Sequence, residues 1–362
     1  MVGSPGVVGL VVNPLAGIGG EVGLGGSDGD AVQAAAAAAG GIPRAPERAE
    51  RFVRELARLA PSAAVLRDPA GSADETAALA RSYAERGVDI LVFVGGDGTA
   101  RDVLRGLGSG AGSGAPAGAG ARQLCLGVPA GVKMHSGVFA VTPEDAAQQV
   151  AEVLAGRAGR ARTVERDVVD LDEEARREGV LSTSIYGTML VPLHERMQRG
   201  KRSPAHGSGI DARGVAAEIR RQYPGHALLF GPGTTVARVS ERLGVDEPTL
   251  LGFDAVLPGG SVHLALGGAE LAALTRDRDF AVVLSPIGGQ GFVIGRGNHQ
   301  LTAEILGRLP RRNLVLVAEP AKLGELAGRL RIDAPTPALN DLFRGPARVI
   351  LGEGEIAVAR IE

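Results

Sequence analysis

The sequence predicts an α/β protein whose N-terminal domain, residues 1–155, is a doubly wound parallel sheet. Short apolar runs alternate there with helix-compatible segments, which is the pattern of a parallel sheet with helices on both faces. The runs are apolar throughout, as in strands buried on both sides. Many of the 55 glycines follow these runs, where α/β proteins bind phosphorylated ligands. Residues 156–362 are expected to form a second domain, for substrate binding or oligomerisation, that is also α/β.

The elements of the first domain follow one another in a regular order. We predict strands over residues 6–12, 63–66, 88–94 and 123–128, and helices over 31–39, 46–60, 72–86, 100–107 and from 143 onward. Ser72 with Glu75 three residues later is typical of a capping box. Thr142 before a proline and two acidic residues is typical of a helix start. The glycine-, serine- and alanine-rich residues 106–121 predict a surface loop, to which we assign no function.

The pattern is less regular in the second domain. We predict strands over residues 163–171, 181–191, 227–230, 249–256, 280–284 and 313–318, and helices over 211–223, 236–243, 269–274 and 302–309. Residues 201–208 are basic and turn-rich, and we expect them to be exposed. Strand–helix alternation resumes at residue 211, and this resumption is the reason to expect a second α/β domain.

The composition argues against several classes of function. A net charge of -2 and a pI near 6.4 give no sign of general nucleic-acid or anionic-membrane binding. The single cysteine, Cys125, lies in an apolar run, so we expect a buried, inert thiol. The six histidines are scattered, and we predict no metal-ligand cluster. We find no signal peptide and no window near the ~18 apolar residues of a membrane span, so a cytoplasmic protein is expected.

The stretch VDILVFVGGDGTAR at residues 88–101 is the leading candidate for a functional site. A buried strand leads into a glycine turn and then a helix, so backbone N–H groups and the positive helix end face an incoming anion. Asp97 lies within this turn, where a carboxylate beside a phosphate is unfavourable unless it binds a metal ion or accepts a proton. We therefore interpret Asp97 as a residue that takes part in the chemistry of the site. The alternative is that Asp97 or Thr99 only caps the helix.

Two further glycine-bearing loops follow predicted strands of the first domain, over residues 13–20 and 129–136. If the first, third and fourth strands are neighbours, these loops converge with GGDGT on one cleft. Asn13 would contribute a neutral side-chain contact to a phosphate. Lys133 would neutralise a phosphate charge, and His135 would donate a hydrogen bond to one. The alternatives are a turn that only redirects the chain, and two surface cations.

Two glycine loops of the second domain are less specific. In GPGTT, at residues 231–235, Gly233 permits a close backbone approach, while Thr234 or Thr235 alternatively caps the next helix. The loop SPIGGQGFVIGRGN holds more glycine than a turn requires. Its Arg296 offers a bidentate anion contact, but the loop matches no motif with a known mechanism.

Several common motifs are absent. The sequence contains no G-x-x-x-x-G-K-[ST], no G-x-S-x-G and no H-E-x-x-H, which argues against a Walker-type NTPase, an α/β-hydrolase and a zincin. Residues 17–23 loosely resemble a dinucleotide fingerprint. However, Asn-Pro separates them from the strand, and no later strand ends in the acidic residue that ribose binding requires. A dehydrogenase is therefore disfavoured.

Several motifs together resemble a known superfamily. GGDGT after an apolar strand resembles the signature of the NAD kinase and diacylglycerol kinase superfamily, and LVVNPLAG is similar to its Asn-Pro-x-x-Gly opening. GVPAGVKMHSGVFAVTPEDAA resembles an NAD kinase segment in which a glycine loop precedes a Phe and a Pro-Glu helix start. With GPGTT and SPIGGQGFVIGRGN, the set is similar to the ATP-NAD kinase-like branch that includes the X-type proteins of bacterial acetoin-catabolism operons. The resemblance covers nearly the whole chain.

The resemblance implies a reaction and roles for these residues. It implies Mg²⁺-assisted transfer of the ATP γ-phosphoryl group to a ribose hydroxyl of NAD, as in NADP biosynthesis, with Asp97 as the general base. Phosphoryl transfer relies mainly on positioning and charge stabilisation, so glycine loops, a metal ion and one base would suffice. No metal ligand is assigned. The residues expected to bind nucleotide are Asn13, Pro14, Gly17, Gly19, Gly95, Gly96, Gly98, Thr99, Gly131, Lys133, His135, Gly233, Thr234 and Thr235.

The sequence also departs from the NAD kinase pattern. The Asn-Glu pair that binds the substrate ribose in NAD kinases is missing between residues 182 and 195. The second domain also lacks the sequence pattern of an all-β domain. The sequence therefore does not identify the acceptor of the phosphoryl group. The alternatives are a nucleotide-sensing protein of the same fold and, less favoured, an NAD-dependent dehydrogenase. We expect small nucleotides as partners, without nucleic acid or membrane, and the resemblance implies a homo-oligomer.

Overall fold

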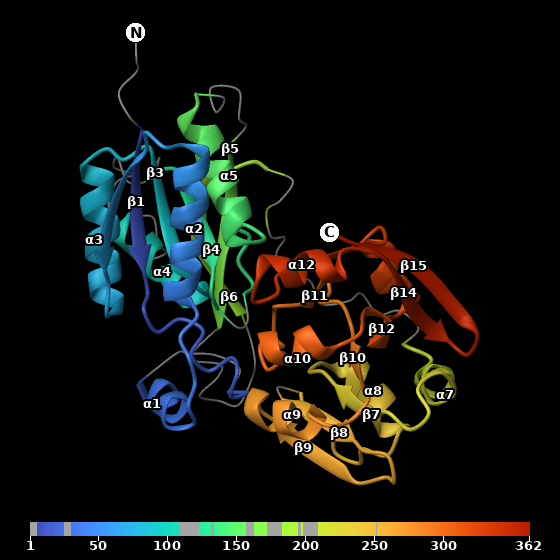
Figure 1. The fold of residues 1–362 in the computed structure, drawn as a ribbon. Helices are drawn as coiled ribbons and strands as arrows, with labels where there is room; N and C mark the ends of the chain where they lie inside the picture. The colour runs from blue at the N-terminus through green and yellow to red at the C-terminus, as the bar shows by residue number, and fades with distance from the viewer. Residues whose placement is uncertain are drawn as a thin grey trace. The chain divides into compact units, whose positions relative to one another are not determined.

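The computed structural model describes residues 6–24, 30–108, 123–131, 134–156, 163–171, 183–194, 197, 209–250 and 252–362. The chain forms two compact units, of residues 1–18 with 43–200 and of residues 19–42 with 201–362, and Figure 1 colours the fold along the chain. This division differs from the boundary expected at residue 155, because residues 19–42 are grouped with the second unit and residues 156–200 with the first.

A four-stranded parallel sheet forms the centre of the first unit. Its strands are β1 (Val7–Val12), β2 (Ala64–Pro69), β3 (Ile90–Gly95) and β4 (Cys125–Pro129). They lie in the order β2-β1-β3-β4, with every neighbouring pair parallel. β3 is buried along its whole length, which is why its sequence is apolar at every position. The predicted parallel sheet is confirmed, and β1, β3 and β4 are neighbours.

Helices cover both faces of this sheet. They are α2 (Ala45–Leu59), α3 (Ala73–Glu85), α4 (Asp97–Gly106) and α5 (Pro143–Leu154). α2 packs with α5 and α3 packs with α4, and Figure 1 shows α2 and α5 in front of the strands. Two predicted helix starts are confirmed, because Ser72 Oγ accepts from Glu75 N at 3.2 Å and Thr142 Oγ1 accepts from Asp145 N at 3.0 Å.

An antiparallel ribbon of two strands completes the first unit. Both of its strands, β5 (Thr163–Leu171) and β6 (Thr183–Pro192), were expected from the sequence. Ser136 fixes the loop after β4 to this ribbon. Its Oγ donates to the carbonyl of Val169 and accepts from the N–H of Val169, each at 2.9 Å. The ribbon therefore lies beside the carboxyl end of β4.

A nine-stranded mixed sheet forms the second unit, in the order β11-β13-β15-β14-β12-β10-β7-β8-β9. The strands are β7 (Ala227–Phe230), β8 (Phe253–Val256), β9 (Val262–Leu266), β10 (Phe280–Leu284), β11 (Phe292–Ile294), β12 (Leu314–Val317), β13 (Arg329–Ile332), β14 (Gly345–Gly352) and β15 (Glu355–Ile361). The central strands β7, β10, β12 and β14 are parallel. β8, β9 and β15 join as antiparallel strands.

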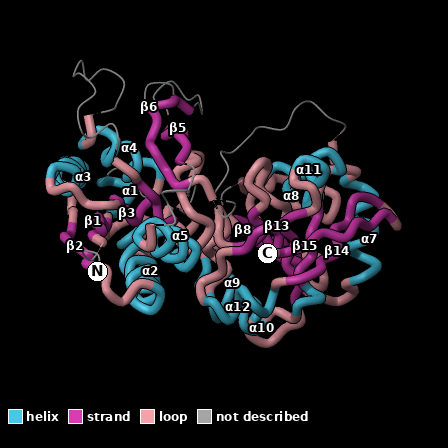
Figure 2. Tube along the Cα trace, turned by 90° about the horizontal axis from the view of Figure 1, so that it is seen from above, coloured by secondary structure: helices cyan, strands magenta, loops and turns pink. Residues whose placement is uncertain are grey.

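Helices lie on both faces of this sheet, so the second domain is α/β, as expected. They are α7 (Ala212–Gln222), α8 (Thr234–Glu241), α9 (Gly268–Thr275), α10 (Ala303–Arg308), α11 (Pro320–Glu325) and α12 (Pro337–Phe343), and helix α1 (Asp30–Ala38) is grouped with the same unit. The core on one face includes side chains of α7 and α8, and the core on the other includes those of α9, α10 and α12. Figure 2 shows α8 and α10 on opposite sides of the strands. No helix in the described part of the chain is long and apolar enough to cross a bilayer.

Several strands of the second unit were not expected from the sequence. These are β9, β11, β13, β14 and β15, and the strand expected from residue 249 begins only at Phe253. β9 is an edge strand whose first four residues are exposed, so it lacks the burial that produces a clear apolar signal. Most of the low-complexity segment and all of residues 172–182 and 201–208 lie outside the described residues.

Cys125 is the first residue of β4 and is fully buried. Burial raises the pKa of its thiol to about 12. A thiolate is the reactive form of cysteine, so this side chain is inert at neutral pH. The expectation of a buried structural thiol is confirmed.

Candidate functional site

Asp97 is the first residue of helix α4, and Gly96 before it is the N-cap. The Asp97 side chain is buried, with a relative exposure of 5%. Its Oδ2 accepts a hydrogen bond from the N–H of His135 at 2.5 Å, and its Oδ1 accepts one from the N–H of Ser136 at 3.0 Å. Both donors lie in the loop after β4. The capping alternative is therefore wrong for Asp97, whose carboxylate binds another loop.

The environment of Asp97 changes its acidity. Burial raises the pKa of its carboxyl group to about 7, even though hydrogen bonds from Ser136 and His135 act in the opposite direction. The negative charge of Asp170 adds to the rise. A carboxyl group with a pKa near 7 exchanges its proton close to neutral pH, which suits a general acid or base.

The loop after β1 meets the same helix. Asn13 Nδ2 donates to Thr99 Oγ1 at 3.1 Å, and Asn13 Oδ1 accepts from the N–H of Leu15 at 3.1 Å. Thr99 is buried in the first turn of α4 and does not cap the helix. The Asn13 amide therefore orients the threonine hydroxyl beside Asp97, and two residues predicted from separate motifs are in contact.

Glycines let the three loops approach one another through their backbones. The carbonyl of Gly95 accepts from the N–H groups of Ala130 at 2.8 Å and Gly131 at 3.2 Å. A Cβ on Gly131 would lie 2.8 Å from the Cα of Gly96, too close for any larger residue. Gly17 has a φ of 84°, and a Cβ there would collide with the carbonyl oxygen of Ala130. The predicted convergence of the three loops is confirmed.

The N-terminus of α4 is suited to an anion. The first N–H groups of a helix have no intrahelical acceptor. Helix α4 begins directly after β3, so its N-terminus lies at the carboxyl edge of the parallel sheet. Together with the positive end of the helix dipole, these N–H groups favour negative charge. The site therefore combines an anion-binding backbone with one buried carboxyl group.

Two residues that contact Arg101 of α4, Asp170 and Tyr186, were not found from the sequence. Asp170, at the end of β5, is 6% exposed and forms an ion pair with Arg101 of α4 at 3.0 Å. The Arg101 guanidinium lies over the ring of Tyr186, 5.6 Å from its centroid. These residues come from β5, β6 and α4, and no local pattern links positions so far apart in the chain.

The predicted nucleotide-binding residues do not all lie in one unit. Asn13, Pro14, Gly17, Gly95, Gly96, Gly98, Thr99, Gly131 and His135 belong to the first unit, and Gly19, Gly233, Thr234 and Thr235 to the second. Lys133 lies outside the described residues. The backbone N–H of His135 binds Asp97. The expectation that its ring binds phosphate stays a prediction.

The GPGTT loop forms the start of helix α8. Gly233 is its N-cap, with a φ of 119°, so the alternative that Thr234 or Thr235 caps the helix is wrong. Lys322 Nζ donates to Thr235 Oγ1 at 2.9 Å and to Ser285 Oγ at 3.3 Å. Ser285 directly follows β10. Lys322, which the sequence did not suggest, thus connects the carboxyl ends of β7 and β10.

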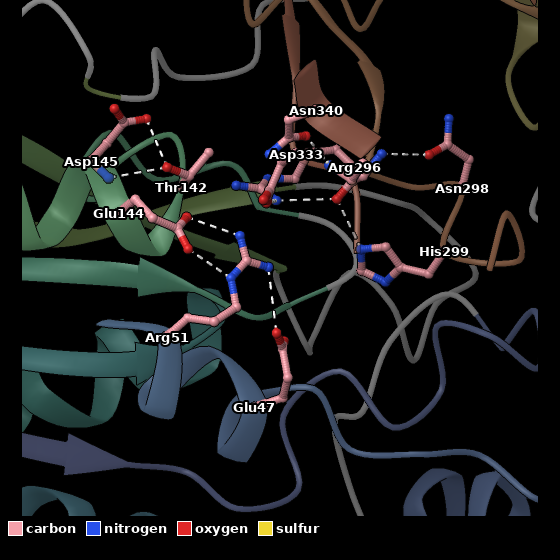
Figure 3. Close-up of polar contacts among 12 residues, drawn as sticks. Glu47, Arg51, Thr142, Glu144, Asp145, Arg296, Asn298, His299, Asp333 and Asn340 are labelled. Carbon is pink, nitrogen blue, oxygen red and sulfur yellow. Dashed lines mark hydrogen bonds and ion pairs between the residues drawn. The ribbon is translucent and has the colours of Figure 1, made fainter. Parts of the chain in front are cut away.

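The glycine loop at residues 285–298 does not present Arg296 to an anion, contrary to expectation. Arg296 is buried and forms an ion pair with Asp333 (Figure 3). Its guanidinium also lies 4.5 Å from the ring centroid of Phe292. Asn298 Oδ1 accepts from the N–H of Gly295 at 2.9 Å. The charge of Arg296 is therefore already neutralised, and the described part of this loop is a buried structural network.

The first unit holds a second buried arginine pair of the same kind. Arg51 of α2 donates from Nε and Nη2 to the two carboxylate oxygens of Glu144, at 2.8 and 2.9 Å (Figure 3). Glu144 lies in the first turn of α5. This bidentate pair fastens α2 to α5 on one face of the sheet, so it is structural.

The described residues contain no group of three or more His, Cys, Asp or Glu side chains that could hold a metal ion. Mg²⁺ is commonly bound by one or two carboxylates together with substrate phosphates and water. Asp97 and Asp170 are the carboxylates beside the anion-binding turn, so the residues present fit an ion that arrives with a nucleotide.

The segment after β1 does not support a dehydrogenase. Residues 14–23 form a series of turns, and helix α1 begins only at Asp30. A dinucleotide fingerprint requires a helix directly after the first glycine turn. The loose match at residues 17–23 therefore lacks its structural context.

Comparison with protein families gives matches in both units. The model of the ATP-NAD kinase N-terminal domain matches residues 8–158, and the model of the ATP-NAD kinase C-terminal domain matches residues 225–360. No curated protein sequence matches the chain.

Comparison with solved structures gives weaker matches. A structure from Bacillus anthracis str. Sterne, provisionally described as a diacylglycerol kinase, is 19% identical over 46% of this chain and 43% of its own, with a TM-score of 0.27. Another from the same strain, described as a diacylglycerol kinase, is 20% identical over 46% of both chains, with a TM-score of 0.25. The chain thus spans less than half the length of these structures, and overlap this low supports no conclusion about the acceptor.

Proposed function

The chain belongs to the ATP-NAD kinase family, and on that premise we propose that it transfers the γ-phosphoryl group of ATP to a ribose hydroxyl of NAD or a related nucleotide. The family supports a kinase-like phosphotransferase. The acceptor and the roles of individual residues are the proposed part. The observation that carries them is the buried Asp97 at the start of α4, with a pKa of about 7.

Asp97 acts as the general base in this proposal. Its ionised carboxylate accepts the proton of the acceptor hydroxyl while the hydroxyl oxygen bonds to the γ-phosphorus and the bond to the leaving ADP oxygen breaks. The N–H groups of His135 and Ser136 fix the carboxylate in place. The raised pKa makes the carboxylate a better base than an ordinary aspartate.

The backbone around Asp97 binds the phosphates. Gly96, Gly98 and Thr99 bring N–H groups at the helix N-terminus toward the anion, and Asn13 holds the Thr99 hydroxyl in place. A bound Mg²⁺ would supply charge neutralisation on the phosphates, with Asp97 or Asp170 as its nearest carboxylates. Positioning and electrostatics of this kind are most of what phosphoryl transfer requires.

The second unit holds a polar group of its own, which in this proposal binds an anion. Thr235, Ser285 and Lys322 form a polar group at the carboxyl ends of β7 and β10, the edge at which α/β sheets bind ligands. The Asn-Glu pair of NAD kinases has no counterpart between residues 182 and 195. We therefore assign no acceptor contact to residues of this chain, and we leave the acceptor to the assay below.

The test is an assay of the purified full chain with Mg²⁺-ATP and a panel of acceptors that includes NAD and NADH, with ADP release as the readout. We expect turnover with at least one acceptor, and its loss in Asp97→Asn with nucleotide binding retained. Asp74→Asn is the matched control, because its carboxyl group is exposed in the same unit. Nucleotide binding without turnover on any acceptor would favour a sensor, and hydride exchange with NAD would favour a dehydrogenase.

A further inference from the structure

A cavity of about 340 Å³ lies in the second unit, at the amino-terminal ends of β12 and β14. Its lining includes Tyr223, which follows α7, Arg311 and Arg312, which precede β12, and Arg348 of β14. The cavity is therefore at the opposite edge of the parallel strands from Thr235. The proposed function gives it no role.

The cavity is strongly cationic. None of its lining residues is acidic, and three are arginines. Arg311 Nη2 donates to the carbonyls of Pro346 at 3.0 Å and Phe343 at 3.4 Å, which fixes its guanidinium group. Arg312 and Arg348 are exposed, and within the described part of the chain neither side chain has a hydrogen bond or an ion pair. Two guanidinium groups are thus available to an incoming anion.

One carboxylate lies near the edge of the cavity and is already neutralised. Glu218 of α7 is 3% exposed and accepts from Arg221 Nη2 at 2.5 Å. It also accepts from the amide of Gln222, a lining residue. Burial of Glu218 between these donors leaves the positive charge of the three lining arginines uncompensated.

Tyr223 supplies a polar group on the same wall. Its hydroxyl donates to the carbonyl of Arg312 at 2.6 Å. Burial raises the pKa of the phenol, while the charges of Arg348 and Arg312 oppose this rise. Both guanidinium charges therefore act on the Tyr223 ring, and the hydroxyl remains protonated at neutral pH.

Apart from Gln222, the rest of the lining is apolar. Leu314, Val315 and Leu316 of β12 contribute to it, together with Ile350 and Ile361. The volume is at the lower end of the range of small-molecule sites, roughly 300–1,000 Å³. An apolar floor beneath a cationic rim suits a ligand that has an anionic end and an apolar or planar body.

We propose that this cavity binds a small organic phosphate, with its phosphate between Arg312 and Arg348 and its apolar part on β12. A dianion suits the site better than a monoanion, because two guanidinium groups have no partner among the described residues and a third is fixed beside them. Such a site is separate from the anion-binding turn of α4, so the chain would respond to a phosphorylated metabolite that is not its substrate.

Calorimetric titration of the full chain with phenyl phosphate tests this site. We expect saturable binding to the wild type, weaker binding of benzoate and of inorganic phosphate, and an increase in Kd of at least tenfold in the double variant Arg312→Gln/Arg348→Gln. Arg276→Gln, an exposed arginine after α9, is the charge-matched control and is expected to leave the Kd unchanged. A phosphate site at α4 keeps its affinity in all three proteins, so the difference isolates the cavity.

Absence of saturable phenyl phosphate binding to the wild type would overturn the proposal, and so would an unchanged Kd in the double variant. If the double variant does not fold, each single replacement is expected to raise the Kd several-fold, and an unchanged value in both would overturn the proposal equally. Kinase turnover is measured separately, so its failure does not affect this result.

Discussion

The two units contain the same strand–turn–helix motif, with different residues at the start of the helix. In each, a parallel strand leads through a glycine turn into a helix whose N-cap is glycine, Gly96 before α4 and Gly233 before α8. The first helical residue is Asp97 in α4 and Thr234 in α8. Both turns suit an anion. Only the first turn also holds a buried carboxyl group. The first helical residue therefore makes one turn suited to proton transfer and the other suited only to binding.

The residues around the two turns also favour different roles, proton transfer at the first turn and anion binding at the second. The loop after β4 encloses Asp97 and donates two backbone N–H groups to it. In the second unit, Lys322 reaches the Thr235 and Ser285 hydroxyls across the strand ends. A buried acid with a raised pKa moves protons, whereas a lysine beside hydroxyl groups neutralises or orients an anion. The predictions below test this distinction, beginning with the largest expected effect.

Replacing the first helical residue of each turn is expected to give the largest difference in kcat between the two. We expect Asp97→Asn to lower kcat by roughly 10²–10⁴-fold, the usual contribution of general acid–base catalysis, with nucleotide affinity largely retained. Thr234→Ala, at the equivalent position of α8, is the matched control, and we expect kcat to fall by less than about threefold. Steady-state kinetics on the accepted substrate measure both effects. Equal losses in the two variants would contradict the division of roles.

The raised pKa of Asp97 predicts a dependence of stability on pH. Its ordinary pKa is 3.8 and its value in the folded chain is about 7, so between these values the folded chain binds more protons than the unfolded chain. Stability from this group is therefore full below about pH 4 and is lost as the pH rises through 7, by an amount on the order of 4 kcal/mol.

Denaturant unfolding of the wild type and of Asp97→Asn across this pH range measures that dependence. Because asparagine does not titrate, we expect the stability of the variant relative to the wild type to increase from pH 4 to pH 8. Asp74→Asn, an exposed carboxyl group in the same unit, should follow the wild type. A difference between Asp97→Asn and the wild type that does not change with pH would show that the pKa of Asp97 is ordinary.

The backbone contact between Gly131 and Gly96 predicts a steric effect. A Cβ on Gly131 would lie 2.8 Å from the Cα of Gly96, so we expect Gly131→Ala to destabilise the protein by about 1–3 kcal/mol. Gly307→Ala in α10 is the control, because a Cβ there contacts nothing and alanine favours the helix by about 0.5–1 kcal/mol. Thermal unfolding compares the two, and a stabilised Gly131→Ala would exclude the close approach of the loops.

Thr235→Val is expected to have the smallest effect. It removes one of the two hydroxyl acceptors of Lys322 while keeping the shape of the side chain, so we expect a loss of stability of about 1 kcal/mol. If the lysine binds an anionic group of a ligand, the affinity for that ligand falls while kcat changes little. Thr234→Val serves as the comparison, because the adjacent Thr234 side chain is exposed. A change in kcat alone would assign chemistry to the second unit.

Local sequence determined the elements that position the first site. Apolar runs buried on both faces revealed β1, β3 and β4, because their burial leaves no polar position. Ser72 and Thr142 marked helix starts, because a capping side chain binds its own first turn. The sequence also singled out Asp97 as a candidate, because a carboxylate in a turn suited to an anion is electrostatically unfavourable unless it takes part in chemistry.

Only the tertiary structure decided what these residues contact. Asp97 meets His135 38 positions away, and Lys322 meets Thr235 across 87 positions. Arg296, which offered an anion contact in the sequence, is neutralised by Asp333 37 positions later. Strand order and packing create such contacts. Periodicity and capping report only on neighbours within a few residues, so the raised pKa of Asp97 and the neutralised charge of Arg296 could not be read from the chain alone.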